Sequence, residues 1–180
     1  TGIKADHVMI SATHTHTGPL LVDLSKRGSS NQSSRQRIAL EYTEGLPPRI
    51  AESVRLANER LRPARLHLAK GRCEGLAFNR RYFLANGTVG WNPGKLNPKI
   101  MLPAGPTDPE VTILYTELPA ALGPTDGIAT YLNFAMHPDT TGGNQFSADW
   151  PGALSRVLAS YHGTNHLTLV ANGTCGNINH

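Results

Sequence analysis

The sequence is poor in cysteine, in charged residues and in long hydrophobic runs, and each shortage excludes a class of protein. Its 180 residues include only two cysteines, Cys73 and Cys175, which is too few for a disulfide-rich scaffold. Charged residues make up 17% and apolar residues 39% of the chain, a composition that excludes a coiled coil. No apolar run approaches the roughly 20 residues that a transmembrane helix needs. We therefore expect no membrane-spanning segment.

Positive charge is present but dispersed. The formal net charge is +4, and the tightest basic cluster surrounds the end of an expected helix. It consists of Arg55, Arg60, Arg62 and Arg65. Apolar positions interrupt this cluster, and no RNA- or DNA-binding signature accompanies it, so we interpret it as a solvated helix face. No nucleic-acid partner is expected.

The ends of the chain suggest a piece of a larger protein. The sequence begins at Thr1 without an initiator methionine and stops at His180, directly after a Gly/Asn-rich turn. We interpret it as an internal fragment, so the lack of a signal peptide says little about location. Neither the oligomeric state nor the redox state of the cysteines follows from the sequence.

What the chain does contain is turn-forming residues and short apolar patterns. The 18 glycines and 13 prolines indicate many loops, as in an enzyme whose site is built from loops on a modest sheet. Apolar patterns predict strands and helices between these loops. In the first half of the chain we expect a buried strand at 8–13, a surface loop at 25–36, a helix at 46–61 and a half-buried strand at 64–68. Little regular structure is expected at 78–109, apart from a hairpin turn at 86–87. In the second half we expect core strands at 111–115 and 128–136 joined by a Gly/Pro turn, a helix at 151–161, and a strand at 167–171.

Two details of the helices can be checked. Pro47 and Pro48 are tolerable only in the first turn of the first helix, and Pro63 lies beyond its end. Asp149 is placed to cap the second helix, although a catalytic role is the alternative. The residues expected on the buried side of that helix are Leu154, Val157, Leu158 and Tyr161.

Helices and strands alternate loosely along the chain, which favours a mixed α/β sheet flanked by helices over an all-β sandwich. There is no internal repeat and no linker that would divide the chain. The sequence therefore predicts a single, loop-rich α/β domain spanning residues 1–180.

Two histidine motifs follow predicted strands. His14 and His16 lie two residues apart, so strand geometry would point both imidazoles toward the same side. His137 follows the strand at 128–136, with a proline directly after it. Imidazole is a common zinc ligand, and ligands of α/β sheets gather at strand ends. Ordinary polar surface is the alternative for the first motif and a structural histidine for the second, but together they favour a shared site.

Two further segments carry candidate site residues. Arg80 lies in the irregular segment at 78–82, where an arginine is either solvated or able to hold a carboxylate or an oxyanion. Residues 172–180 (NGTCGNINH) follow the last strand, and their glycines and asparagines suit a tight loop with exposed backbone amides. A plain turn is the alternative for this second segment.

In their order and spacing, the four segments resemble the neutral/alkaline non-lysosomal ceramidases along nearly the whole chain. Residues 10–19 (ISATHTHTGP) are similar to the family signature S-x-T-H-T-H-S-G-P. Residues 133–140 (NFAMHPDT) resemble N-F-x-x-H-P-T, and the family continuation S-x-D-x-x-G resembles residues 147–152. Residues 78–80 are similar to the family N-R-S segment, and 176–180 stand at the place of its G-D-V-S-P-N loop.

The resemblance implies the N-terminal catalytic domain of a zinc-dependent amide hydrolase. Ceramidases hydrolyse the amide of ceramide with one zinc ion, so a small-molecule or lipid-like amide substrate and a secreted or periplasmic location are implied. By motif, His14 and His137 would be zinc ligands, and His16 would face the reacting carbonyl or replace His14. Arg80 matches the family arginine near the substrate. The zinc would polarise the carbonyl and activate a water for attack.

This chain departs from the family in two respects. The family's remaining zinc ligands, a Glu and a Tyr, have no counterpart in residues 1–180, so the set of zinc ligands is incomplete here. Asn177 and Asn179 stand where the family has an Asp and its proposed catalytic Ser, and asparagine cannot act as a nucleophile. His180, which replaces a proline, can transfer protons near neutral pH. An exposed terminal histidine is the alternative.

Three functions remain open at this point. The first is a zinc-dependent, ceramidase-like hydrolase of an amide or ester bond, acting in lipid metabolism if its substrate is a sphingolipid. The second is a metal-binding relative that has lost catalysis and acts as a binding protein. The third is a structural or carbohydrate-binding domain with incidental histidines. Metal content separates the third from the others, and substrate turnover separates the first from the second.

Overall fold

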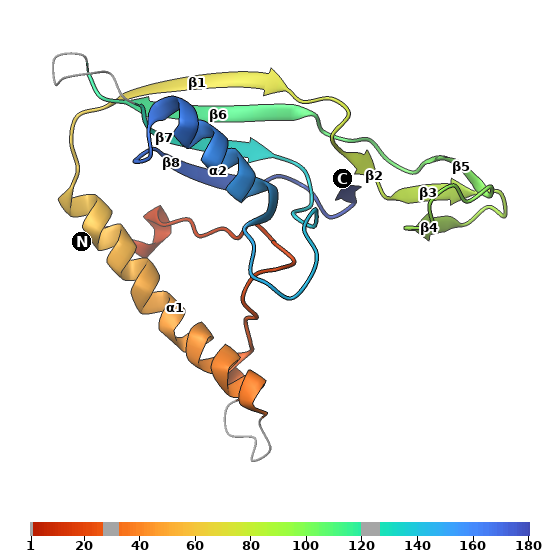
Figure 1. Ribbon diagram of the computed structural model, residues 1–180, viewed down its shortest axis with the longest axis horizontal. Helices are drawn as coiled ribbons and strands as arrows, with labels where there is room; N and C mark the ends of the chain where they lie inside the picture. The colour runs from red at the N-terminus through yellow and green to blue at the C-terminus, as the bar shows by residue number, and fades with distance from the viewer. Residues whose placement is uncertain (1, 27–32, 120–126) are drawn as a thin grey trace. The chain divides into compact units, whose positions relative to one another are not determined.

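The computed structural model describes residues 2–26, 33–119 and 127–180, which form two compact units. The first unit comprises residues 1–10 and 18–63, and the second comprises residues 11–17 and 64–180. The second unit is a mixed α/β structure, in agreement with the predicted fold class (Figure 1).

The first unit is dominated by one long helix. It contains short 3₁₀ turns at Ala5–His7 and Leu24–Lys26, followed by α1 (Ser34–Glu59). The start of α1 is fixed by a capping box, in which the Ser33 side chain accepts from the Gln36 backbone and the Gln36 side chain accepts from the Ser33 backbone. The expected loop at 25–36 is therefore wrong at its end, because the helix has already begun, while residues 27–32 lie outside the described part.

The prolines of α1 also differ from expectation. Pro47 and Pro48 lie inside the helix rather than in its first turn. The sequence analysis took the apolar stripe from Leu46 onward as the whole helix, whereas the capping box starts it at Ser34. Adjacent prolines remove two backbone donors from the same turn, so the damage to the hydrogen-bond ladder is confined to one place. The helix ends at Glu59, before Pro63.

The centre of the second unit is a four-stranded sheet with the order β1-β6-β7-β8. Its strands are β1 (Arg65–Arg72), β6 (Glu110–Glu117), β7 (Gly127–Phe134) and β8 (Leu167–Asn172). The first three run antiparallel, and β8 runs parallel to β7. A parallel pair needs a crossover connection, which α2 (Asp149–His162) provides. These strands confirm the predicted ones, but β1 is exposed along its whole length rather than half-buried. The predicted turn between β6 and β7 lies outside the described residues.

The core of this unit lies between the sheet and α2 (Figure 1). Leu132 and Phe134 of β7 point to the same face of the sheet, because they are two residues apart. Together with Met136 they are packed by Trp150 and Leu154 of α2. Two of the four residues of α2 that were predicted to be buried are exposed instead. Val157 is 52% and Tyr161 is 80% exposed, which is a correction.

Short strands occupy the stretch that was expected to be irregular. A three-stranded sheet has the order β4-β3-β5, and β2 pairs with β9. These strands are β2 (Phe78–Asn79), β3 (Arg81–Leu84), β4 (Val89–Trp91), β5 (Ile100–Pro103) and β9 (Ile178–Asn179). The turn at Asn86–Gly87 joins β3 to β4 as predicted, and Gly87 has the positive φ of 80° that such a turn favours. The β2–β9 pair brings Arg80 beside the chain segment that ends at His180.

Three smaller findings complete the fold. Residues 8–13 do not form the predicted strand, and Met9 and Ile10 are exposed, because no partner strand pairs with them. Cys73 and Cys175 are both free thiols. Within the described ranges, no helix combines the length and the hydrophobicity that crossing a membrane requires.

Candidate metal centre

Residues 11–17 lie against the second unit through hydrogen bonds rather than as a strand. The Asn172 side chain donates to the carbonyl of Thr13, and the backbone amide of His16 donates to the carbonyl of Pro138 (3.1 Å each). Thr15 and Thr17 each donate through their hydroxyls to the carbonyl of Ser147. This irregular segment is therefore anchored at several points to loops that follow the core strands.

His14 has a left-handed backbone, with a φ of 64°. Side chains other than glycine rarely adopt this conformation, and where it occurs it often marks a functional site. The expectation that strand alternation aligns His14 and His16 is therefore wrong. The turn at His14 and the anchoring of His16 to Pro138 aim the two rings instead.

His137 is fixed more tightly than the other two histidines. It lies three residues beyond the end of β7, and only 3% of it is exposed. Its backbone amide donates to the carbonyl of Ile178 (3.1 Å), and its Nδ1 lies 2.7 Å from the carbonyl oxygen of Cys175. A carbonyl only accepts, so Nδ1 carries the proton and Nε2 keeps a free lone pair.

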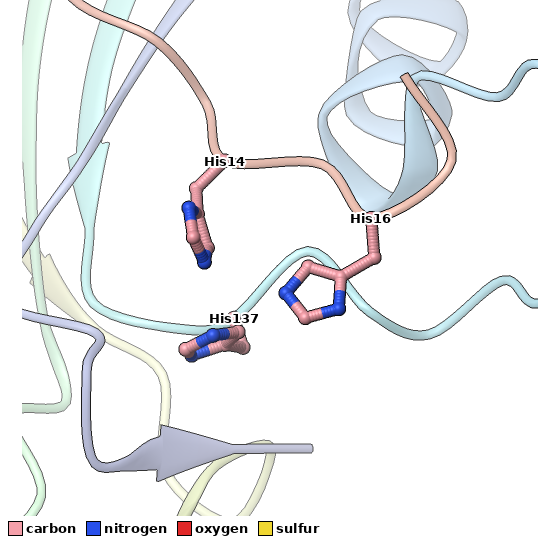
Figure 2. Close-up of side chains that lie close together, drawn as sticks. All are labelled: His14, His16 and His137. Carbon is pink, nitrogen blue, oxygen red and sulfur yellow. The ribbon is translucent and has the colours of Figure 1, made fainter. Parts of the chain in front are cut away.

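The three rings converge on one point (Figure 2). Their centroids are 4.9 Å apart for His14 and His137, 5.1 Å for His14 and His16, and 5.2 Å for His16 and His137. The planes stand nearly perpendicular to one another, at 76–83°. One nitrogen from each ring lies within 4.8 Å of the others. The convergence expected from the two histidine motifs is thus observed.

The group suits a divalent metal such as zinc. Nitrogen ligands on one tetrahedral zinc lie about 3.3 Å apart, because each Zn–N bond is about 2.0–2.1 Å long. The nitrogens of the three rings, within 4.8 Å of one another, are somewhat farther apart than this. Three imidazoles that meet at one point are a donor set that suits zinc.

The surroundings of His14 favour its neutral form. Partial burial lowers its pKa, and the neighbouring His137, His16 and Arg80 lower it further, while Asp139 acts in the opposite direction. A lowered pKa leaves the imidazole unprotonated to more acidic pH. Only the unprotonated nitrogen can bind a metal, so this electrostatic environment favours the ligand form.

Arg80 lies beside the histidines and is tied to the loop that holds His137. Its backbone amide donates to the carbonyl of Asn177 (2.8 Å), and its Nη2 donates to the carbonyl of Gly176 (2.7 Å). The guanidinium also lies over the ring of Trp91, 4.7 Å from its centroid. Its Nε is buried, and no partner for it is found among the described residues. The guanidinium is thus held by Gly176 and Trp91, and its charge acts on the pKa of His14.

Asp149 does not cap α2 from outside, as was expected, but is its first residue. The position before it, Ala148, makes no side-chain cap. The Asp149 carboxylate accepts hydrogen bonds from Thr140 Oγ1 (2.8 Å) and from the amides of Thr141 and Trp150 (2.7 Å each). It thus ties the loop after His137 to the start of the helix and contacts none of the three histidines.

Of the predicted site residues near the end of the chain, Asn177 contacts Arg80, whereas Asn179 and His180 contact other parts of the structure. Asn177 offers its backbone carbonyl to Arg80, and Asn179 pairs with Phe78 through the β2–β9 ladder. His180 is exposed and lines a cavity of about 530 Å³. The other walls of that cavity come from β2 and from the segment 82–100, not from the three histidines.

A second cavity, of about 620 Å³, adjoins the loop that holds His137. Gly176, Asn177 and Ile178 of this loop form part of its wall, and Arg81 and Phe83 of β3 form another part. None of the three histidines lines this cavity, which has room for a small organic group.

Asp139 is not among the site residues predicted from the sequence. Its carboxylate Oδ1 lies 3.3 Å from Nδ1 of His16, and the other nitrogen of the His16 ring faces His14 and His137 (Figure 2). The signal in the sequence was a carboxylate two residues after His137, within a motif that had already been singled out.

Comparison with known proteins reveals similarity in structure but not in sequence. No protein-family model matches the chain, and no curated protein matches it. The crystal structure of neutral ceramidase from Pseudomonas aeruginosa aligns with 82% of the chain at a TM-score of 0.52 and 16% identity. A ceramidase complexed with C2 aligns with 94% at a TM-score of 0.60 and 19% identity.

The alignment covers only a part of these larger proteins. This chain spans 21% of the length of the first ceramidase and 24% of the second. At such low identity the match concerns the fold alone. The chain therefore has a mixed α/β fold that is also found within neutral ceramidases, the family that its histidine motifs resemble.

Proposed function

We propose that this chain is part of the catalytic domain of a zinc-dependent hydrolase that cleaves an amide or ester bond, as ceramidases do. The observation that carries the proposal is the convergence of His14, His16 and His137, with one nitrogen of each within 4.8 Å of the others. The ceramidase-like fold and the order of the motifs support the same reading.

The residues of the centre have complementary roles in this proposal. His14 and His137 hold the metal, and His16 completes the group or faces the substrate carbonyl. When bound, zinc polarises a carbonyl and lowers the pKa of water, which are the two requirements of hydrolysis. Arg80 stabilises negative charge that develops on the carbonyl oxygen through its positive charge, which lies close enough to act on the pKa of His14. The family pattern implies two further ligands, a Glu and a Tyr, which have no counterpart among these 180 residues.

The surroundings of the centre and the comparisons support one class of substrate. We expect a small-molecule or lipid-like amide, because the solved structures with this fold are ceramidases and the cavity beside the His137 loop can take an organic group. A secreted or periplasmic location and a role in sphingolipid metabolism belong to the same proposal.

One observation favours a second candidate, a metal-binding protein without catalysis. Asn177 and Asn179 stand where the G-D-V-S-P-N loop of the ceramidases has its Asp and its Ser. An asparagine side chain neither attacks a carbonyl nor exchanges protons. A hydrolase that uses a metal-activated water is compatible with this change, whereas one that depends on a serine nucleophile is not.

Metal content and turnover of the intact protein test the proposal. We expect close to one zinc per chain and hydrolysis of ceramide or of simpler N-acyl amides and esters. His137→Ala should lower zinc affinity by more than about 100-fold, since loss of a residue that only hydrogen-bonds to a metal ligand already costs about 10–100-fold. His67→Ala is the matched control, because His67 lies on β1 and bonds to Glu117 instead.

The outcomes separate the candidates. Zinc with turnover supports the hydrolase, and zinc without turnover of any amide or ester supports the silent binding protein. If the wild-type protein held no zinc, or if His67→Ala lost as much affinity as His137→Ala, both candidates would fail.

A further inference from the structure

The carboxylate of Asp139 has no role in the function proposed so far. Asp139 follows Pro138, and its Oδ1 lies 3.3 Å from Nδ1 of His16. Each of the two side chains is 39% exposed. An exposed pair of this kind contributes little to stability, about 0–1 kcal/mol, so stability alone gives no reason for its presence.

The backbone places Asp139 firmly against the His16 ring. The amide of His16 donates to the carbonyl of Pro138 (3.1 Å), and Pro138 is fully buried. The preceding residue, His137, is held to Ile178 by its own amide. Two consecutive residues of one loop therefore contact His16, Pro138 at its backbone and Asp139 at its ring.

This contact favours one ring nitrogen of His16 as the site of the proton. A carboxylate is negatively charged and only accepts hydrogen bonds, so in the neutral ring its position beside Nδ1 favours a proton there and leaves the lone pair on Nε2. Nε2 is the nitrogen that points toward His14 and His137 (Figure 2). The carbonyl of Cys175 fixes the same tautomer in His137. The rings of His16 and His137 thus have the same tautomer, and the oxygen atoms that favour it come from different parts of the chain.

We propose that Asp139 is a positioning residue that holds His16 in the Nδ1–H tautomer and makes Nε2 the third metal ligand. The inference rests on the proposed metal centre and chooses between the two roles left open for His16. A carboxylate that accepts from a ligating histidine orients the ring and strengthens it as a ligand. No hydrogen bond of the His14 ring is found among the described residues, so the centre relies on Asp139 and Cys175 for its orientation.

The tautomer can be measured without any metal. Long-range ¹H–¹⁵N NMR spectra of the metal-free intact protein distinguish an Nδ1–H from an Nε2–H histidine. We expect His16 to be Nδ1–H in the wild-type protein and to shift toward Nε2–H in Asp139→Ala. Glu74→Ala is the control, because Glu74 is an exposed carboxylate that pairs with Arg72. An Nε2–H signal in the wild type, or no change in Asp139→Ala, would overturn the inference.

The affinity for zinc gives the second readout. Asp139→Ala should weaken zinc binding by about 10–100-fold, whereas Glu74→Ala should leave it unchanged. A loss of affinity without a change of tautomer would show that Asp139 is itself a ligand, which contradicts a positioning role. If the wild type bound no zinc while its His16 was Nδ1–H, the proposed function would fail and the tautomer assignment would stand. The two failures are therefore distinguishable.

Discussion

Asp149→Asn is the substitution whose effect the structure predicts most sharply. Only 5% of Asp149 is exposed, and both of its carboxylate oxygens accept hydrogen bonds. Oδ1 accepts from Thr140 and Trp150, and Oδ2 accepts from the amide of Thr141. Asparagine has only one accepting oxygen, so its amide group must face a donor on the other side. Losing one such charge-assisted bond and burying a donor against a donor should cost about 2–4 kcal/mol.

The pH dependence of this cost has a definite sign. Burial acts to raise the pKa of Asp149, but the hydrogen bonds from Trp150, Thr140 and Thr141 outweigh it, and the pKa lies below its ordinary 3.8. The stabilisation is therefore complete above that ordinary value and is lost as the pH falls through the pKa of the folded state. The difference between wild type and Asp149→Asn should be largest near pH 7 and should shrink in acid.

Urea unfolding of the intact protein at pH 7 and at lower pH measures this difference. Asp108→Asn is the matched control, because Asp108 is exposed and uses only Oδ1, which accepts from the Glu110 amide. It should cost less than about 0.5 kcal/mol, as surface substitutions usually do. If Asp149→Asn were equally mild at pH 7, Asp149 would act as an ordinary helix cap and the reasoning from its two oxygens would be refuted.

Two further predictions concern catalysis by the intact protein. Arg80→Ala should lower kcat/KM by about 100-fold, as loss of an oxyanion donor does, and should change the melting temperature little. An unchanged kcat/KM would mean that the guanidinium only ties down the loop at Gly176. His180→Ala should alter the pH–rate profile if His180 transfers protons, and zinc content measured alongside separates this from a role as ligand. If neither changed, His180 would have no part in the reaction.

The strands of the main sheet were predictable because their signal is local. Residues 128–134 are mostly apolar or β-branched, and both this strand and β8 end near turn-forming residues. His137 could be placed beyond β7 for the same reason. The start of α1 could also have been found, since Ser33 and Gln36 have the spacing of a capping box.

The arrangement of His14 and His16 was not predictable from local pattern. Their segment is apolar enough to suggest a strand, but no other strand pairs with it. Its partners are Pro138, Ser147 and Asn172, all more than a hundred residues away along the chain. The resemblance in motifs located the histidines correctly, whereas the physical reason for their convergence came only from the tertiary structure.

The short strands around Arg80 were missed for a related reason. β2 and β9 have two residues each, too few for any periodicity to be recognised. They form because each lies beside the other, about 100 residues apart in the sequence. Because the β2–β9 pair could not be predicted, the sequence placed Arg80 near the histidines only through the resemblance to the ceramidases.

The turn from Cys175 to Ile178 holds both His137 and Arg80 entirely through main-chain carbonyls. Every amino acid supplies the same carbonyl, so a mutation that changes a side chain in this turn leaves the attachment in place. Natural selection can therefore exchange the side chain at position 177 without first dismantling the metal centre. A protein built in this way can drift between related reactions, or between enzyme and binding protein, through intermediates that still fold.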